Sequence, residues 1–167
     1  GQPAASSVPQ VGVTTVNSQP VTLLTQLPGR TNAVKTAEVR PQVSGVVQKL
    51  LFTEGGEVKA GQPLYQIDPA TYKAAYDKAL ATWQNDAMVV KRYQPLAAAH
   101  AISQQTYDDA VAAERTAKAD VETAKVNLDY TLVKAPIAGH ISRSLVTAGA
   151  LVTNGQTDYL ATIQQLD

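Results

Sequence analysis

The chain has 167 residues, with 14 Lys and Arg balanced by 14 Asp and Glu, and two His that lie far apart. Zero net charge argues against nucleic acid as a partner, because phosphate binding depends on clustered basic side chains. The absence of Cys excludes disulfides, thiolate metal sites and a Cys nucleophile, and no apolar run approaches the roughly 20 residues that cross a bilayer.

Short strands are predicted in three parts of the chain. Residues 11–16 and 21–27 are rich in Val, Leu and Thr, with a turn around Pro20 between them. Alternating apolar residues punctuated by Gly and Pro predict further strands in 37–68 and again in 131–162.

The intervening segment, residues 69–130, is predicted to be helical. It contains no Gly and sixteen Ala, a composition that favours helix. Asp68 is placed to cap a first helix over residues 69–95, because Pro69 suits the first helical position. Pro95 is expected to end or kink that helix.

A second helix is predicted over residues 104–130, with Ser103 as its N-cap and Asp108 and Asp109 in its first turn. Apolar and small side chains recur along both helices at helical spacing: Tyr72, Tyr76, Ala79, Trp83, Ala87, Val90 and Tyr93, then Tyr107, Ala110, Glu114, Ala117, Val121, Ala124 and Leu128. Similar lengths and a short connection predict an antiparallel coiled-coil hairpin, and an ion pair between Glu114 and Lys118 is expected on its surface.

The strand-rich regions form an internal repeat that the hairpin separates. Residues 39–65 match residues 133–159 at nine of 27 positions, including three Gly pairs and the pair of Tyr65 with Tyr159. Shared Gly positions indicate bends at the same places. We therefore predict that two similar strand sets pack face to face as a small β-sandwich with pseudo-twofold symmetry.

The half-motif E-G-x-x-V-x-x-G-Q-x-L, at residues 54–64, resembles the lipoyl and biotinyl carrier domains. The resemblance implies a cofactor on a Lys at an exposed turn between the halves. Here the hairpin occupies that junction, and Lys73 and Lys78 fall within the first predicted helix. A carrier function is therefore disfavoured, and no cofactor is expected.

Longer strings extend the comparison along nearly the whole chain. They are QLPGRT (26–31), AEVRPQVSG (37–45), LYQIDPATY (64–72), NLDYTLVKAPIAGHI (127–141) and GALVTNGQ (149–156). Together with a lipoyl-like sandwich split by a hairpin, they resemble the periplasmic adaptors, or membrane fusion proteins, of tripartite multidrug efflux pumps, in particular those that serve RND-type transporters.

This resemblance implies an α+β fold in which an antiparallel helical hairpin splits a lipoyl-like β-sandwich. The implied parts are incomplete membrane-proximal and β-barrel strands in 1–36, a first lipoyl half-motif in 37–68, the hairpin in 69–130, a second half-motif in 131–162 and a truncated β-barrel return in 163–167.

Family adaptors link an inner-membrane RND drug–proton antiporter to an outer-membrane channel as periplasmic hexamers. The resemblance therefore implies a non-catalytic protein associated with the inner membrane, with no metal or nucleic-acid site, whose lipid anchor is expected to be absent from this chain. The family's channel-docking pattern R-x3-L-x6-S matches Arg92, Leu96 and Ser103 at the predicted hairpin tip. Simple structural roles suit the same residues: a cation in a last helical turn, a loop-closing Leu and an N-cap.

Two alternatives remain. An adaptor of an ATP-driven exporter or a type I secretion system would share the fold and the hairpin. A lipoyl-type carrier is less expected, and an intact mass without a lipoyl or biotinyl adduct would eliminate it.

Overall fold

The computed structural model describes residues 34–165. These residues form, in chain order, β2 (Thr36–Val39), β3 (Gly45–Leu50), β4 (Glu57–Val58), β5 (Pro63–Ile67), α1 (Ala70–Ala98), α2 (Gln104–Asp129), β6 (Leu132–Lys134), β7 (Gly139–Ile141), β8 (Leu151–Val152) and β9 (Ala161–Gln164). The strands expected in 11–16 and 21–27 lie outside the described residues, as does the end of the expected return strand at 166–167.

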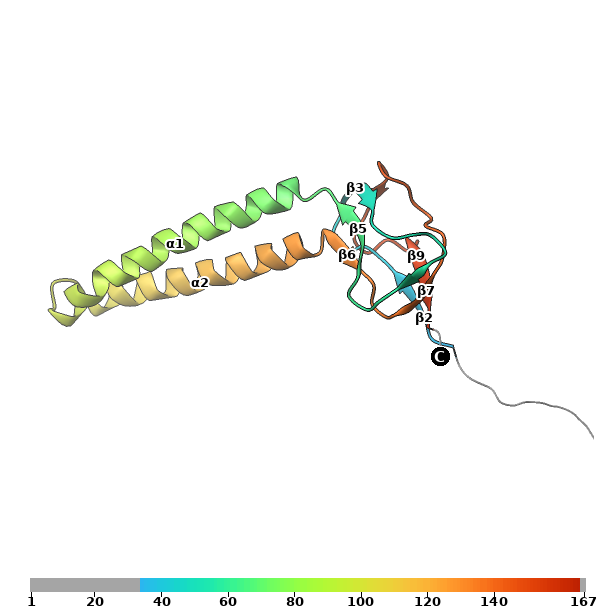
Figure 1. Cartoon of the computed structure of the whole chain (residues 1–167). Coiled ribbons are helices and arrows are strands. Elements are labelled where there is room, and N and C mark those ends of the chain that lie inside the picture. The colour runs from blue at the N-terminus through green and yellow to red at the C-terminus, as the bar shows by residue number, and fades with distance from the viewer. Residues whose placement is uncertain (1–33, 166–167) are drawn as a thin grey trace, which may run out of the picture. The chain divides into compact units, whose positions relative to one another are not determined.

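The strands form two antiparallel four-stranded sheets, ordered β2-β9-β7-β4 and β6-β5-β3-β8 (Figure 1). Each sheet takes two strands from each half of the repeat. The two strand sets predicted to pack face to face are therefore interleaved, and neither half forms a layer of its own. Exchanging strands in this way lets apolar residues of both halves share a single core.

The repeat is visible in the strand order itself. If β2, β3, β4 and β5 correspond to β6, β7, β8 and β9, replacing each strand of the first sheet by its counterpart reproduces the order of the second. The turns correspond as well, because the backbone amides of Lys59 and Thr153 donate to the side-chain carbonyls of Gln62 and Gln156, at 3.0 and 2.7 Å. The strand order and the matching turns therefore confirm the predicted pseudo-twofold relation.

The correspondence shifts by two residues just before β9. Backbone bonds join Leu51 N to Leu64 O at 2.7 Å and Leu145 N to Leu160 O at 2.8 Å. The two donors, Leu51 and Leu145, lie 94 positions apart in sequence. Their acceptors, Leu64 and Leu160, lie 96 positions apart. The second half therefore has two additional residues between Gln156 and Leu160, compared with the segment between Gln62 and Leu64 in the first half.

Because of this shift, the predicted match of Tyr65 with Tyr159 is wrong in structural terms. Tyr65 lies opposite Val133 in its ladder, and Ala161 lies opposite Val39, the counterpart of Val133. The structural counterpart of Tyr65 is thus Ala161. Tyr65 is fully buried in the core that both sheets share, and a second large ring would have to compete for the same interior space.

The two helices lie side by side and are joined by a tight turn, as the hairpin prediction requires (Figure 1). All the predicted seam positions are buried or partly buried, and Ala117 and Val121 are the most enclosed. The polar seam member Glu114 accepts a hydrogen bond from Trp83 Nε1 at 2.6 Å. Its predicted ion pair with Lys118 does not form among residues 34–165, because the carboxylate faces the seam.

The boundaries of α1 differ from the predicted ones at both ends. The helix begins at Ala70, and Pro69, predicted as the first helical residue, is instead the N-cap; Asp68 Oδ1 lies one residue earlier and accepts a hydrogen bond from Ala70 N at 3.0 Å. Pro95 does not end α1, which continues to Ala98, because Ala99 N donates to the Pro95 carbonyl at 3.0 Å and closes the last turn.

The start of α2 also needs one correction. The predicted Ser103 cap is present, since its Oγ accepts from Thr106 N at 3.0 Å. However, no acidic residue lies in the first turn of α2. Asp108 and Asp109 lie one turn further on, where they accept hydrogen bonds from the Gln104 and Gln105 side chains at 2.9 and 2.7 Å.

The hairpin leaves the sheets from two neighbouring strands, β5 and β6. Ile67 N donates to Thr131 O at 2.7 Å, where these two strands meet the helices. The Thr131 side chain is buried, and its hydroxyl donates to the Leu128 carbonyl at 2.6 Å. The Tyr72 hydroxyl of α1 donates to the Ser44 carbonyl of the sandwich. Neither helix described between residues 34 and 165 is long and apolar enough to span a membrane.

Candidate functional site at the hairpin tip

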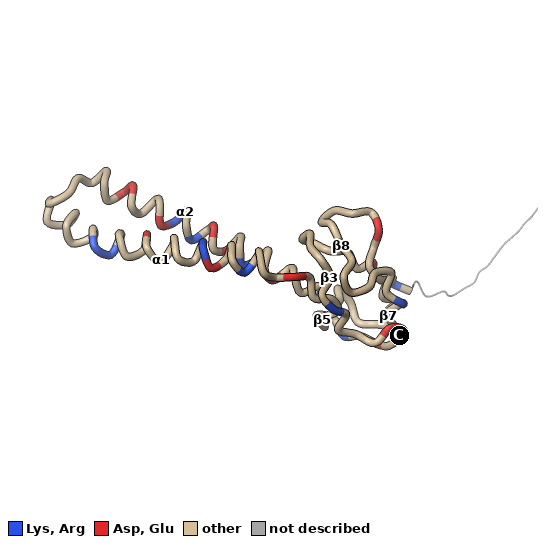
Figure 2. The backbone as a smooth tube through the Cα atoms, turned by 90° about the horizontal axis from the view of Figure 1, so that it is seen from above, with Lys and Arg blue, Asp and Glu red and all other residues tan. Residues whose placement is uncertain are grey.

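The tip of the hairpin is an uncharged surface between two charged borders. Residues 93–107 contain no Lys, Arg, Asp or Glu, whereas Lys91 and Arg92 precede them and Asp108 and Asp109 follow (Figure 2). Most of the residues at the turn are exposed. A partner can therefore approach the tip without displacing water from formal charges, except at its borders.

Backbone hydrogen bonds fix the turn. Ala101 N donates to Leu96 O at 2.7 Å, and His100 N donates to Ala97 O at 3.1 Å. This pair of bonds is the Schellman arrangement, in which the residue after the helix end adopts a left-handed conformation. His100 occupies that position with φ of 59°, where Gly is the usual residue. The turn is therefore a defined structure.

Leu96 presents an apolar side chain from this fixed turn. It lies on α1 and is 38% exposed. Its carbonyl accepts the bond from Ala101, so the closing hydrogen bond of the turn also holds the Leu96 backbone. The predicted role as a loop-closing residue leaves a substantial part of the side chain available for contact.

Arg92 lies one helical turn before Leu96 and so shares its face of α1. The guanidinium is exposed, and within residues 34–165 it forms no salt bridge. Ser103 lies across the turn, where its Oγ caps α2 and lies 2.8 Å from Thr106 Oγ1. If Thr106 donates in that contact, the Ser103 hydroxyl proton remains free for a partner.

The arrangement offers an apolar anchor bordered by a cation and a hydroxyl on a rigid turn. Such a surface is small, so it suits binding in which several copies act together. The three residues were found by their spacing. The left-handed His100 was not, because a turn without Gly gives no local signal for that conformation. Among residues 34–165, no group of three His, Cys, Asp or Glu side chains is placed to hold a metal ion.

The comparisons with known proteins agree on one family. The family model described as "RND MFP, barrel-sandwich hybrid domain" matches residues 35–164. The chain is 56% identical over 165 residues to the multidrug resistance protein MexA of Pseudomonas aeruginosa, covering 99% of this chain and 43% of MexA. It is 54% identical over 164 residues to the toluene efflux pump periplasmic linker protein TtgG of Pseudomonas putida, covering 98% of this chain and 42% of TtgG.

A solved structure gives the same result. A MacA–MexA chimera containing the Pseudomonas aeruginosa MexA α-hairpin domain superposes with a TM-score of 0.74 and 40% identity, covering 79% of this chain and 48% of the chimera. The chain spans less than half the length of these relatives. With a family match over most of its residues and more than half of its positions identical to MexA, the chain belongs to the RND membrane fusion proteins.

Proposed function

We propose that this chain is the central part of a periplasmic adaptor that links an inner-membrane RND drug–proton antiporter to an outer-membrane channel. The names of the relatives support this role, since TtgG is a periplasmic linker of a toluene efflux pump and MexA a multidrug resistance protein. The adaptor acts by contact, as a hexamer associated with the inner membrane, and performs no catalysis.

The domain assignment belongs to the same proposal. Residues 37–68 and 131–162 are two lipoyl-type half-motifs, and residues 69–130 are the hairpin that extends toward the channel. Residues 1–36 and 163–167 belong in this proposal to incomplete strands of membrane-proximal and β-barrel domains, except that Thr36, Ile163 and Gln164 pair within the sandwich itself. The interleaved sheets support the assignment, because each layer requires strands from both half-motifs.

Channel docking occurs through Arg92, Leu96 and Ser103. The observation that carries this proposal is the exposure of an apolar residue and an unpaired cation beside an uncharged turn, within the described residues. Leu96 provides the apolar contact, while Arg92 and Ser103 donate hydrogen bonds that orient it. Affinity then comes from repetition of this small contact around a ring of copies.

The test introduces Arg92→Asp and Leu96→Ser separately into the complete protein. Each variant is expected to retain wild-type helix content and expression, because both side chains are exposed. Drug resistance is expected to fall to that of cells without the adaptor, and cross-linking to the channel from the exposed position 99 of the same turn is expected to disappear.

Matched controls separate docking from general damage. Met88→Ser changes an apolar residue of α1 that is 63% exposed and lies outside the uncharged tip. Arg115→Asp reverses an exposed charge on α2. Both controls are expected to preserve resistance. Normal resistance in the Arg92 and Leu96 variants at normal expression would refute the docking assignment.

A further inference from the structure

The second half of the repeat lacks an aromatic pair that fills the first half. In the first half, the Phe52 ring packs edge-on against the Tyr65 ring, with 5.3 Å between the centroids. The structural counterparts of these residues are Val146 and Ala161, as the backbone bonds and ladder registers show. Two rings are thus replaced by much smaller side chains, and Val146 lines a cavity of about 760 Å³.

The two additional residues of the second half build one wall of this cavity. Residues 157–159 occupy the place that Pro63 alone takes in the first half. Arg40 fixes this wall, because its Nε and Nη2 donate to the Thr157 carbonyl at 3.3 and 3.0 Å. Its guanidinium carbon also lies 5.9 Å from the centroid of the Tyr159 ring.

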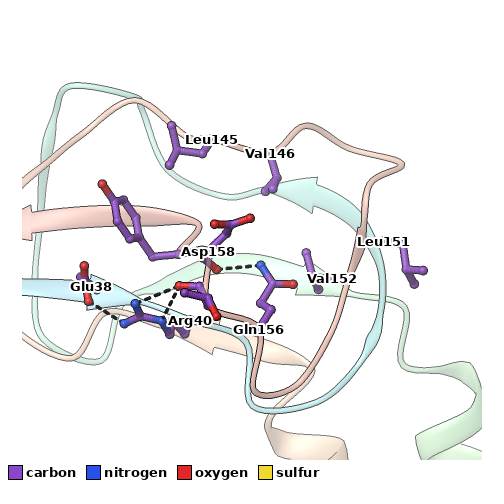
Figure 3. A pocket seen from close by; sticks show the side chains of 10 residues that line it. Glu38, Arg40, Leu145, Val146, Leu151, Val152, Gln156 and Asp158 are labelled. Atoms are coloured by element: carbon purple, nitrogen blue, oxygen red, sulfur yellow. Dashed lines mark hydrogen bonds and ion pairs between the residues drawn. The ribbon is translucent and has the colours of Figure 1, made fainter.

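The opposite walls of the cavity are apolar. They are formed by Leu145, Val146, Leu151 and Val152 (Figure 3). Leu151 is 72% exposed and Leu145 is 58% exposed, although both are large apolar side chains. Exposed apolar groups around a hollow of this size favour a bulky apolar ligand, since small-molecule sites commonly enclose some 300–1,000 Å³.

The charges at the cavity leave one carboxylate without a partner. Arg40 Nη1 donates to Glu38 Oε1 at 2.6 Å, so these two charges balance each other. Asp158 also lines the cavity, and among residues 34–165 its carboxylate forms no salt bridge. In Figure 3 this carboxylate lies between the apolar residues and Arg40. The lining therefore carries a net charge of one negative unit, which complements a cation.

We propose that this cavity binds a small organic cation with a bulky apolar body. The apolar part takes the space beside Val146 that an aromatic ring fills in the other half, and the positive charge lies against Asp158. Arg40 acts as a positioning residue, because its donors are already used by Glu38 and the Thr157 carbonyl. This proposal is independent of channel docking by the hairpin tip.

The test uses tetraphenylphosphonium and its isosteric anion tetraphenylborate as probes, titrated into the 167-residue chain by calorimetry. The cation is expected to bind saturably at one site and the anion not to bind there. Asp158→Asn is expected to weaken cation binding at least about tenfold, equivalent to ~1.4 kcal/mol. Val146→Phe is expected to abolish binding without lowering the thermal midpoint, because the new ring fills the cavity.

Asp108→Asn is the matched control, since it removes the same charge from the distant hairpin and is expected to leave the affinity unchanged. Equal binding of both probes, no binding of the cation, or unchanged affinity in Asp158→Asn would overturn the proposal. The proposal would also be overturned if adding the cation changed the NMR chemical shifts of backbone amides on the hairpin and not those of Val146 and Gln156. Sedimentation showing that a second copy of the chain fills the cavity and excludes the probe would overturn it as well.

Discussion

Tyr65 forms hydrogen bonds that connect the two halves of the repeat. It belongs to the first half, yet its hydroxyl contacts Ser144 Oγ at 2.8 Å and donates to the Leu160 carbonyl at 3.2 Å, both in the second half. Burial raises the pKa of Tyr65 above 10.0; the hydrogen bond with Ser144 opposes this shift, and the charge of Glu54 adds to it. The folded protein therefore favours the neutral phenol.

This shift predicts a pH dependence of stability. The pKa is higher in the folded state, so the contribution of Tyr65 is complete below 10.0 and is lost as the pH rises through the folded-state value. Tyr65→Phe is expected to lower the free energy of unfolding near neutral pH by about 1–2 kcal/mol, because the hydroxyl's hydrogen bonds to Ser144 Oγ and to the Leu160 carbonyl are both lost; that carbonyl keeps only its bond from Leu145 N. Urea denaturation at several pH values measures both effects.

The variant should also lose less stability than the wild type when the pH is raised above 10.0, since the shifted group is gone. Tyr130→Phe provides the control, because that ring is 36% exposed and its hydroxyl has no hydrogen-bond partner among residues 34–165. If Tyr65→Phe and the wild type lost stability equally as the pH rose above 10.0, the buried phenol would not be the cause of the alkaline loss of stability.

Sequence reasoning was most successful for the helices, because the signals that form them are local. The Ser103 cap and the seam positions follow from side-chain types at fixed spacing, and the structure confirms both. Pro95 shows the limit of local reasoning, since the last turn closes on its carbonyl despite the missing donor. Glu114 shows another limit, because its partner Trp83 lies on the other helix.

Strand pairing could be predicted only in part, because it joins residues far apart in sequence. The repeat correctly indicated matching turns, but it could not show that strands alternate between the sheets. The two-residue shift before β9 was also hidden, since an ungapped comparison aligned Tyr159 with Tyr65. Residues 157–159, where the shift occurs, form one wall of the cavity lined by Val146, so composition and motifs gave no sign of that cavity.

The pairing of the helices predicts how the hairpin tolerates changes of length. Trp83 and Glu114 face each other, so the point after Gln84 in α1 lies opposite the point after Ala112 in α2. Seven residues inserted at one point alone would displace the facing turns by about 10 Å, whereas insertion at both points keeps them matched. The single insertion is expected to lower the thermal midpoint of the helical signal by roughly 5 °C or more.

Circular dichroism of the three proteins is sufficient to compare these midpoints. The double insertion is expected to melt at or above the wild-type temperature, because it lengthens the paired seam without changing its register. Equal midpoints for the single and double insertions would contradict the pairing of α1 with α2. Each insert should repeat the local seam pattern, so that helix propensity stays constant.

At the scale of the whole molecule, the hairpin is an insertion between two strands that already pair. β5 and β6 are antiparallel neighbours, and Ile67 and Thr131 form the last backbone bond before the helices. The two helices bury a seam of their own, whereas the buried core cluster lies in the sandwich, with Tyr72 of α1 packed against it. The sandwich therefore holds the determinants of its own fold, and the helices add length.

This arrangement predicts that the sandwich folds without the hairpin. Replacing residues 69–129 by Asn-Gly joins Asp68 to Tyr130 through a two-residue turn that matches the twist of antiparallel strands. The shortened chain is expected to keep both sheets, although with lower stability, because the bond from Tyr72 to Ser44 is lost. Dispersed amide and methyl NMR signals, with Ile67 and Ile163 in contact with shared core neighbours, would report the native topology.

The same topology predicts the opposite result for a single half. A peptide of residues 34–68 contains β2 to β5, but β2 and β4 pair only with strands of the second half. It is therefore expected to give the narrow NMR signals of an unfolded chain, since its apolar strand residues have no second layer to cover them. A folded half peptide, or a disordered shortened sandwich, would show that the interleaved sheets are not the unit that stabilises this protein.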